Sequence, residues 1–344
     1  MALGMSVASD IANALLKFYT KGPALLQTMQ DRPLLRFLNA AKKNFSGGNQ
    51  YISDPVKGAV MYDTAGFFVG YTEDEELTFA QAQNILRAET LWYECHAGLI
   101  ISWTELKKDG ITVTDGSKKT EHSNTEVFRL TSLLQDRLED FRESWARAMN
   151  NMLWRDGSQD AQQVPGVLSF LTATPAVGTT AGLNRATYSW WRHIYKDPIT
   201  PSEENQYLTK ALRQTQRDLK RYGGKPNKWL AGSDFLDALE NEIQAKGQYT
   251  VTGFTKVNDI EMGDVSLGRV GLFEYDPTLD DLSLSKYCYE FDSRRMKLRP
   301  MEGEENKLLT PERPYNYAVF LQSMTWTGAL TVTQLNCHAV FSIA

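Results

Sequence analysis

The chain has 344 residues, of which 42% are hydrophobic and 11% aromatic, so it is long enough for about two domains with proper cores. Its 37 basic and 42 acidic residues give a net charge of −5, which disfavours tight binding of nucleic acid. No apolar run approaches the roughly 18 residues of a membrane span, and the N-terminus lacks a basic segment followed by an apolar one. We therefore expect a product that is cytosolic when made and does not enter a membrane.

Residues 1–45 are predicted to form an N-terminal arm of two or three short amphipathic helices. Their apolar positions recur at helical spacing, but Gly22-Pro23 and Pro33 interrupt the pattern. Helical pieces this short cannot make a core of their own. We expect the arm to lie along another part of the protein or along another subunit.

Residues 46–83 contain dispersed glycines among β-forming residues such as Tyr51, Val60 and Phe67. This composition predicts a long hairpin from residue 46 to about residue 78. Two strands without a covering layer are marginal in water, so a neighbouring structure would have to hold them. A pair of strands in an ordinary sheet is the alternative on composition alone.

A single long helix is predicted at 123–157, after a buried strand at 86–104 and a polar loop at 107–120. Ser123 and Glu126 have the spacing of a capping box, and Gly157 suits a left-handed residue that ends a helix. A rod on the order of 45 to 50 Å long would join regions instead of sitting inside one. Its apolar stripe, in steps of three or four, consists of Val127, Leu130, Leu134, Leu138, Phe141, Trp145, Met149 and Met152.

The densest aromatic patch lies at 182–193, after an apolar segment at 164–171 that is predicted to be a short strand or turn. Trp190 and Trp191 in this patch are compatible with a platform on which a base or a sugar stacks. The alternative is packing at a joint between domains, which is favoured because tryptophan mostly serves burial.

Residues 200–285 are predicted to be a compact α/β unit. Thr200-Pro201-Ser202-Glu203 has the form of a capping box and is predicted to open a helix that stops at Gly223-Gly224. Ser233 is predicted to cap a second helix that ends at Gly247. The final part, 286–344, is rich in β-formers whose aromatics need partners from earlier in the chain, so we expect 200–285 to be an insertion in a discontinuous domain.

Sequence motifs for chemistry are missing. No glycine-rich nucleotide loop and no Gly-x-Ser-x-Gly elbow occurs, and the four histidines lack the spacing of a metal site. The three cysteines are odd in number and far apart, which fits a reducing compartment. The acidic residues 73–76 lack the pattern of a calcium loop and are interpreted as a solvated hairpin tip. We expect neither a cofactor nor a metal, and no enzymatic activity.

Three segments resemble recurrent parts of the major capsid protein of tailed bacteriophages, which has the Hong Kong 97-type fold. They are Phe45-Ser46-Gly47-Gly48 before the hairpin, Gly182-Leu183-Asn184-Arg185-Ala186-Thr187 followed by Trp190-Trp191-Arg192, and Trp326-Thr327-Gly328-Ala329-Leu330-Thr331 near the end. The order of predicted elements resembles the same family over nearly the whole chain. The resemblance implies an α+β chain that assembles into an icosahedral head shell.

The resemblance also implies a division of the chain and a set of partners. Residues 1–45 would be the N-terminal arm, 46–83 the extended loop, 84–199 with 286–344 the peripheral domain with its spine helix at 123–156, and 200–285 the axial domain. Copies would form hexamers and pentamers around double-stranded DNA, with a portal, a separate scaffolding protein and optionally a decoration protein. The protein would be made in the cytoplasm of a bacterial host and would reside in the virion.

Candidate contacts between subunits follow from the resemblance and from a predicted hairpin that cannot bury itself. Some capsids of this family link a loop lysine to an asparagine of another subunit, but no motif identifies partners for Lys57, the one lysine of the loop. The candidates are Lys57, Met61, Tyr62, Phe67, Phe68, Arg185, Trp190 and Trp191. Two alternatives are the shell protein of a bacterial encapsulin-type nanocompartment and a soluble α+β enzyme with scattered catalytic residues.

Overall fold

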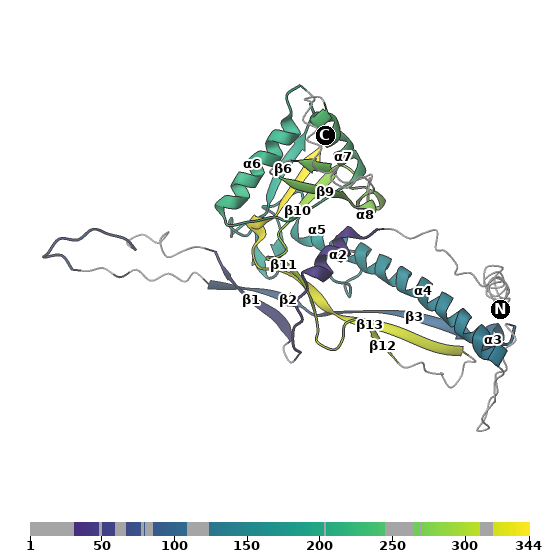
Figure 1. Cartoon of the computed structure of the whole chain (residues 1–344). Helices are drawn as coiled ribbons and strands as arrows, with labels where there is room; N and C mark the ends of the chain where they lie inside the picture. The colour runs from purple at the N-terminus through teal and green to yellow at the C-terminus, as the bar shows by residue number, and fades with distance from the viewer. Residues whose placement is uncertain are drawn as a thin grey trace. The chain divides into compact units, whose positions relative to one another are not determined.

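The computed structural model describes most of the chain, and its described residues divide into two compact units. The described residues are 31–47, 50–58, 67–76, 79, 85–108, 124–202, 204–244, 265–267, 270–309 and 319–344. The first unit contains Glu94–Met149 and Gly303–Trp326, and the second contains Asp31–Tyr93, Asn150–Glu302 and Thr327–Ala344. Predictions for residues 1–30 lie outside the described residues. Figure 1 shows the elements in chain order.

The predicted long helix is present as α4 (Asn124–Trp154), and Gly157 beyond it has the expected left-handed φ of 90°. Ser123 lies outside the described residues. In the first unit, Arg137 forms an ion pair with Glu105 of the short helix α3 (Trp103–Lys108), at 2.6 Å. Trp145 donates its indole N–H to Asn306 at 3.0 Å. These contacts attach the middle of α4 to residues on either side of it in the chain.

Strands β3 (Tyr93–Ser102) and β12 (Lys307–Leu308) both pair with the long strand β13 (Val319–Val332). The buried strand predicted at 86–104 is instead two strands, β2 (Ile85–Leu91) and β3, followed by α3. Its predicted burial is also wrong, because side chains of β3 alternate between half-buried and exposed positions. A sheet with one covered face produces that alternation.

A six-stranded sheet dominates the second unit. Its central strand pairs are antiparallel, and each parallel pair lies toward an edge: β14 with β6, and β7 with β9. Three of the strands lie outside 200–285, so the predicted axial boundary cuts through one sheet. In sheet order the strands are β6 (Ile194–Ile199), β14 (Ala339–Ile343), β10 (Tyr287–Phe291), β7 (Lys228–Ala231), β9 (Gly271–Tyr275) and β8 (Val265–Leu267).

Helices α6 (Tyr207–Arg221) and α7 (Ser233–Gln244) pack on one face of this sheet. The predicted capping box is wrong: α6 begins at Tyr207, after Gln206 in the left-handed region. The buried carboxylate of Glu242 on α7 accepts the backbone N–H groups of Leu208 (3.1 Å) and Thr209 (3.0 Å). A carboxylate from a neighbouring helix therefore satisfies the free N–H groups and the dipole at this helix start.

A buried carboxylate, Asp276, organises the side of the second unit that receives the end of α4. One oxygen of Asp276 accepts the Trp154 indole N–H at 2.8 Å, and the other accepts the backbone N–H of Thr278 at 2.9 Å. Asp276 also accepts the backbone N–H of Leu34, near the start of α2 (Pro33–Ala40), and it caps α8 (Pro277–Asp281). The part of the arm within the described residues thus docks on its own chain.

Aromatic rings continue this packing along β10. Tyr289 and Phe291 stack on one face of the strand, and Trp154 lies 5.1 Å from the ring of Tyr289. Phe37 of α2 lies 5.7 Å from Phe291. The end of the long helix and the docked arm are therefore held against the sheet by burial as well as by hydrogen bonds.

The predicted hairpin exists, but its second strand lies later in the chain than the sequence suggested. Strand β1 (Tyr51–Lys57) pairs antiparallel with β2, from Tyr51 opposite Leu91 to Lys57 opposite Ile85. The hairpin base is fixed to β11 (Met296–Pro300) by the ion pair of Arg299 with Asp54, at 2.9 Å. β11 pairs in turn with residues 328–332 of β13.

The remaining described elements are short. The segment 164–171, predicted to be a strand or turn, contains the helix α5 (Val167–Phe170). A small hairpin follows, formed by β4 (Thr179–Thr180) and β5 (Leu183–Asn184), and a 3₁₀ turn spans Leu335–Cys337. Cys95, Cys288 and Cys337 are free thiols, and Cys288 and Cys337 are buried. Among the described helices, none has the length and apolar character needed to cross a bilayer.

We expect Asp276→Asn to lower the free energy of unfolding by about 2 kcal/mol or more. An amide offers one acceptor oxygen where Asp276 offers two, so a buried N–H group would lose its partner. Denaturant unfolding measures the change. Asp281→Asn, an exposed change on the same short helix, is the matched control and should stay within about 0.5 kcal/mol of the unmodified protein. Equal stability of both variants would contradict the central role of Asp276.

A second prediction concerns Glu290, which is fully buried beneath α6 and receives a hydrogen bond from Gln216. Burial raises the pKa of Glu290 to about 8, against a usual value of 4.5. Between these values the unfolded chain releases a proton that the folded chain keeps, so stability falls as pH rises from about 4.5 to 8. Glu290→Gln removes this titration. As pH rises from 5 to 8, the free energy of unfolding of the variant should therefore increase by on the order of 2 kcal/mol relative to that of the unmodified protein. Thermal unfolding of both proteins across this pH range measures the difference. Thermal midpoints that change with pH in the same way for both proteins would contradict the raised pKa of Glu290.

Candidate intersubunit surfaces

Arg185 lies at the centre of a buried network of hydrogen bonds that shapes residues 169–193. Its guanidinium, 1% exposed, donates to the carbonyls of Ser169 (2.8 Å) and Phe170 (2.7 Å) at the end of α5. It also donates to the hydroxyl of Thr172, at 3.0 Å. Burial lowers the pKa of Arg185, and the carbonyl groups replace the water that the cation has lost. Arg185 therefore joins its own segment to residues 169–172 by hydrogen bonds.

The three residues after Trp190 complete the same network. Trp191 is fully buried and donates its indole N–H to the carbonyl of Thr180 at 3.2 Å. Arg192 donates to the carbonyl of Arg185 at 2.7 Å, and His193 pairs through Nε2 with the carbonyl of Thr172 at 2.7 Å. Burial lowers the pKa of His193 to about 4, so its ring is neutral at pH 7 and donates from Nε2. We call residues 169–193 the arginine loop.

The arginine loop contacts the base of the extended hairpin on both strands. The backbone N–H of Glu89 on β2 donates to the carbonyl of Ala181 at 2.9 Å. Gly58, just after β1, lies so close to Trp190 that a Cβ at this position would overlap the indole ring. Only glycine fits there without a shift of the ring or the backbone. Trp190 and Ala181 therefore fix the direction in which the hairpin leaves the subunit.

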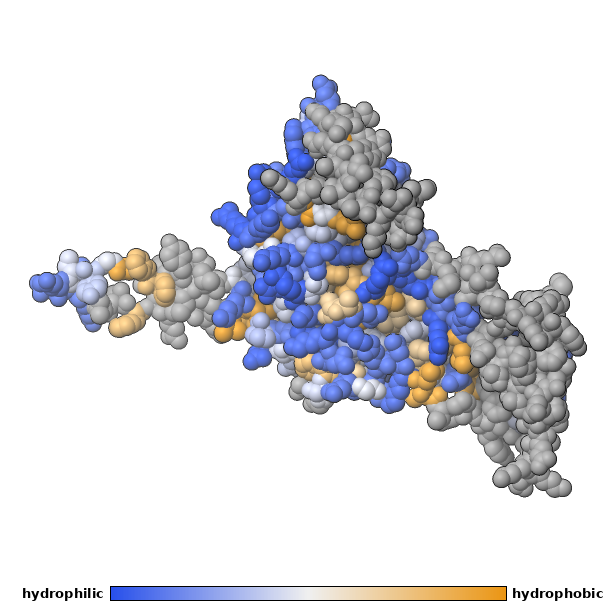
Figure 2. Space-filling model, in the orientation of Figure 1, coloured by the Kyte–Doolittle hydropathy of each residue, from blue (hydrophilic) through white to orange (hydrophobic). Residues whose placement is uncertain are grey.

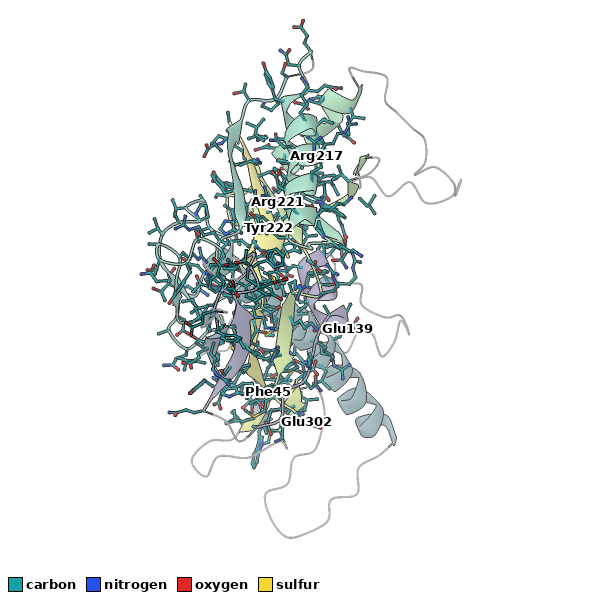
Figure 3. All side chains as sticks on the ribbon, turned by 90° about the vertical axis from the view of Figure 1, so that its left-hand side faces the viewer. Phe45, Glu139, Arg217, Arg221, Tyr222 and Glu302 are labelled. Carbon is teal, nitrogen blue, oxygen red and sulfur yellow. The ribbon has the colours of Figure 1, made fainter. Side chains whose placement is uncertain are left out.

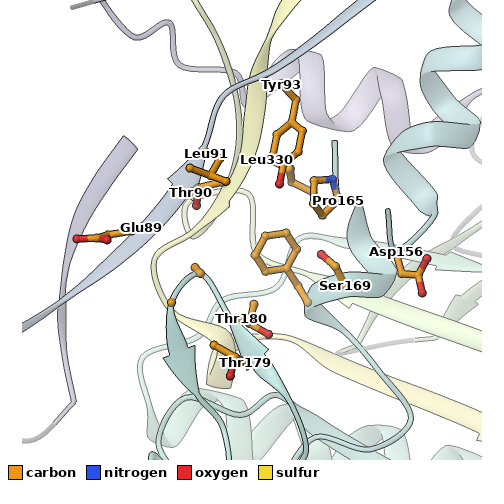
Figure 4. Close-up of a pocket in the computed structure, with 13 residues that line it drawn as sticks. Glu89, Thr90, Leu91, Tyr93, Asp156, Pro165, Ser169, Thr179, Thr180 and Leu330 are labelled. Atoms are coloured by element: carbon orange, nitrogen blue, oxygen red, sulfur yellow. The ribbon is translucent and has the colours of Figure 1, made fainter. Parts of the chain in front are cut away.

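A cavity of about 310 Å³ lies between β2, α5 and the β4–β5 hairpin (Figure 4). Two of its polar side chains take part in local turns: Ser169 donates to the carbonyl of Gly166, and Asp156 accepts two hydrogen bonds from Ser158. Those hydrogen bonds lower the pKa of Asp156. No histidine or cysteine lines this cavity, and no metal-binding group of side chains occurs among the described residues.

The described tip of the extended loop exposes large apolar side chains. Phe68 is 88% exposed and Phe79 is 93% exposed, with Phe67, Val69 and Tyr71 also on the surface. Figure 2 shows apolar residues gathered on this projecting segment. Four acidic residues follow at 73–76, where Glu75 and Thr72 form a turn. An aromatic group presented to water on a projecting hairpin is typical of a surface that another protein covers.

The candidate contacts predicted from the sequence divide into four groups. Lys57, Phe67 and Phe68 lie at exposed positions, whereas Met61 and Tyr62 lie outside the described residues. Arg185 and Trp191 are buried in this chain, and their side-chain N–H groups donate to carbonyls of the arginine loop. Trp190 is half-buried against Gly58. Sequence reasoning missed the contacts of Gly58 and Ala181, which have no local signature.

Comparison with solved structures places nearly the whole chain in one fold. No protein-family model matches the chain, and no curated protein matches its sequence. The capsid asymmetric unit of cyanophage A-1(L) is similar with a TM-score of 0.64 at 14% identity, over 94% of this chain and 96% of that chain. The capsid of Myoviridae phage XM1 gives a TM-score of 0.57 at 11% identity, over 95% and 98%.

A third similar structure is the holo-SrpI encapsulin complex from Synechococcus elongatus PCC 7942, with a TM-score of 0.50 at 13% identity, over 99% of this chain and 96% of that chain. Phage capsids and this encapsulin share the Hong Kong 97-type fold. The fold class predicted from the sequence is therefore confirmed.

We expect Trp190→Ala to loosen the hairpin base without unfolding the subunit. Removing the indole opens space beside Gly58, so amides of β1 and β2 should exchange with deuterium about tenfold faster or more. Hydrogen exchange read by mass spectrometry resolves these strands from the six-stranded sheet. Tyr207→Ala, which truncates an exposed aromatic of α6, should leave both regions unchanged. Unchanged exchange in β1 and β2 of the Trp190 variant would exclude this role.

Proposed function

We propose that the chain is the major capsid protein of a tailed double-stranded DNA bacteriophage, with a structural role in place of an enzymatic one. Many copies assemble into the icosahedral shell of the virion. The observation that carries the proposal is the match in fold over 94% of this chain and 96% of a cyanophage capsid chain. The exposed aromatic tip of the extended loop supports it independently, because such a surface requires a partner.

Burial of the loop tip by a neighbouring copy would stabilise the contact between the two copies. Each large apolar side chain gains about 1.5 to 3 kcal/mol when it leaves water. A shell repeats the same contact at every subunit, so interfaces of modest area add up in the closed assembly. The hairpin base, which Arg299, Trp190 and Ala181 fix to the subunit, gives the tip a defined place to dock.

The remaining assignments belong to the same proposal. Residues 1–45 serve as the arm, 46–83 as the extended loop, 84–199 with 286–344 as the peripheral domain, and 200–285 as the axial domain, whose sheet also takes in β6, β10 and β14. Copies form hexamers and pentamers. A portal and a separate scaffolding protein take part in assembly, and a decoration protein is an optional addition.

The shell encloses DNA without sequence-specific binding. A net charge of −5 suits a shell that encloses a polyanion without binding it tightly. Synthesis takes place in the cytoplasm of the bacterial host. Negative-stain electron microscopy of the protein expressed with its scaffold is the direct test: closed shells are expected, and a persistent monomer would refute the proposal.

A bacterial nanocompartment shell is the second candidate, favoured by the likeness to an encapsulin over 99% of this chain. That function would require shells that form without a scaffold and that carry an enzyme. Purified particles distinguish the two, since mass spectrometry of the contents identifies a cargo protein and nuclease protection identifies DNA.

We expect Phe68→Asp to abolish or strongly reduce shell formation while leaving the subunit folded. The substitution puts a charge where an apolar side chain would be buried between copies, which costs several kcal/mol at the contact. Particle yield by sedimentation and the thermal midpoint of the subunit are measured together. Val177→Asp, at another exposed apolar position, is the control and should assemble normally. A large drop in the thermal midpoint for Phe68→Asp would place the loop tip in the subunit's own core instead.

A further inference from the structure

Helix α6 carries a row of basic side chains on its exposed surface. The five residues Lys210, Arg213, Arg217, Lys220 and Arg221 are spaced by three, four, three and one, so they share one side of the helix. All five are exposed, and Figure 3 shows Arg217 and Arg221 following one another along α6. Neither Arg217, Lys220 nor Arg221 forms an ion pair with any described residue. We call this row the basic ridge.

Helix α7 carries the opposite charge. Its exposed charged residues are Asp234, Asp237 and Glu240, and its other acid, Glu242, is buried as the cap of α6. No Lys or Arg occurs in the helix. Asp237 and Glu240 have no ion pair within the described part of the chain. We call Asp234, Asp237 and Glu240 the acidic ridge.

The two ridges belong to different halves of one helix layer. Both helices cover the same face of the six-stranded sheet, but α6 contacts β6 at one end of the strand order, whereas α7 contacts β9 near the other end. One unit therefore presents positive charge over one half of its helix layer and negative charge over the other. Because the ridges lie on the same chain, a second copy supplies the complement to each of them.

We propose that the basic ridge of one copy docks on the acidic ridge of the next copy within a ring of subunits. Two different surfaces of the same chain meet in such a contact, so the arrangement is head-to-tail and closes into a ring when the rotation permits. The inference rests on the proposed function, which supplies the neighbouring copies. Each exposed ion pair is weak, but several of them repeat around a ring and set its register.

DNA is the competing occupant of the basic ridge, and the charges favour a copy of the chain. A duplex carries negative charge along its whole length, so it would be repelled by the acidic ridge on the same helix layer. A second copy satisfies both ridges at once, and this also accounts for an acidic helix and a basic helix within a chain whose net charge is only −5.

The test uses charge reversal and its rescue in the full chain, expressed with its scaffold. Arg217→Glu, Lys220→Glu and Arg221→Glu together leave the basic ridge with a net charge of −1, so that both ridges are acidic. Asp237→Lys with Glu240→Lys leaves the acidic ridge with a net charge of +1, so that both ridges are basic. Each set of changes should lower shell yield about tenfold or more by placing like charges opposite each other. The fivefold variant, which combines the two sets, restores opposite charges and should recover yield to within about threefold of the unmodified protein. Arg217→Lys with Arg221→Lys keeps the charge and should assemble normally.

Thermal unfolding of each isolated subunit shows whether a variant has folded, and the fivefold rescue keeps the test decisive if one set of changes is unstable. Failure of the fivefold variant to recover, with all subunits folded, overturns the proposal. Normal shells that lack DNA after reversal of the basic ridge alone would assign that ridge to DNA and also overturn it. An unmodified protein that forms no shells would instead contradict the proposed function, and the ridges would then have no neighbouring copy to meet.

Discussion

The carboxylate of Asp276 is the interaction on which the arrangement of the second unit depends. It accepts hydrogen bonds from the indole of Trp154 and from the first turns of α2 and α8, so three separate helices share one buried acceptor. Burying a carboxylate costs free energy unless hydrogen-bond donors fill its lone pairs, and here two of the donors, Trp154 and Leu34, are distant from Asp276 in the sequence. The end of α4, the arm and the sheet can therefore occupy their positions only together.

The arginine loop shows what one of the three sequence segments that resemble the capsid family does in the folded chain. The guanidinium of Arg185 connects this segment, Gly182 to Arg192, to the carbonyls of Ser169 and Phe170. Trp190 and Ala181 of the arginine loop contact the base of the extended hairpin. The residues of this segment are needed to aim a hairpin. Their chemistry is structural, and the aromatic tip that the hairpin presents lies elsewhere in the chain.

The features that could be predicted from the sequence are those that neighbouring residues determine. The bounds of helix α4 were predicted to within a few residues, because its apolar spacing and Gly157 belong to one continuous stretch of the sequence. The start of α6 was not, since its cap, Glu242, follows more than thirty residues later and no neighbouring residue marks it. The partner of β1 was missed for the same reason: register between β1 and β2 depends on the arginine loop and on Arg299. Arg185 looks like a surface cation until the carbonyls around it are known.

The cap at the start of α6 has a mechanical consequence. Because the carboxylate of Glu242 on α7 holds backbone N–H groups of α6, a pull on one helix reaches the other through short, buried hydrogen bonds instead of through the flexible length of a loop. The two helices are therefore coupled directly, without the loop between them. In the proposed ring of subunits, a force applied at one contact between copies would be transmitted through this pair of helices with little deformation. The stiffness of such a ring would then depend on the contacts between copies.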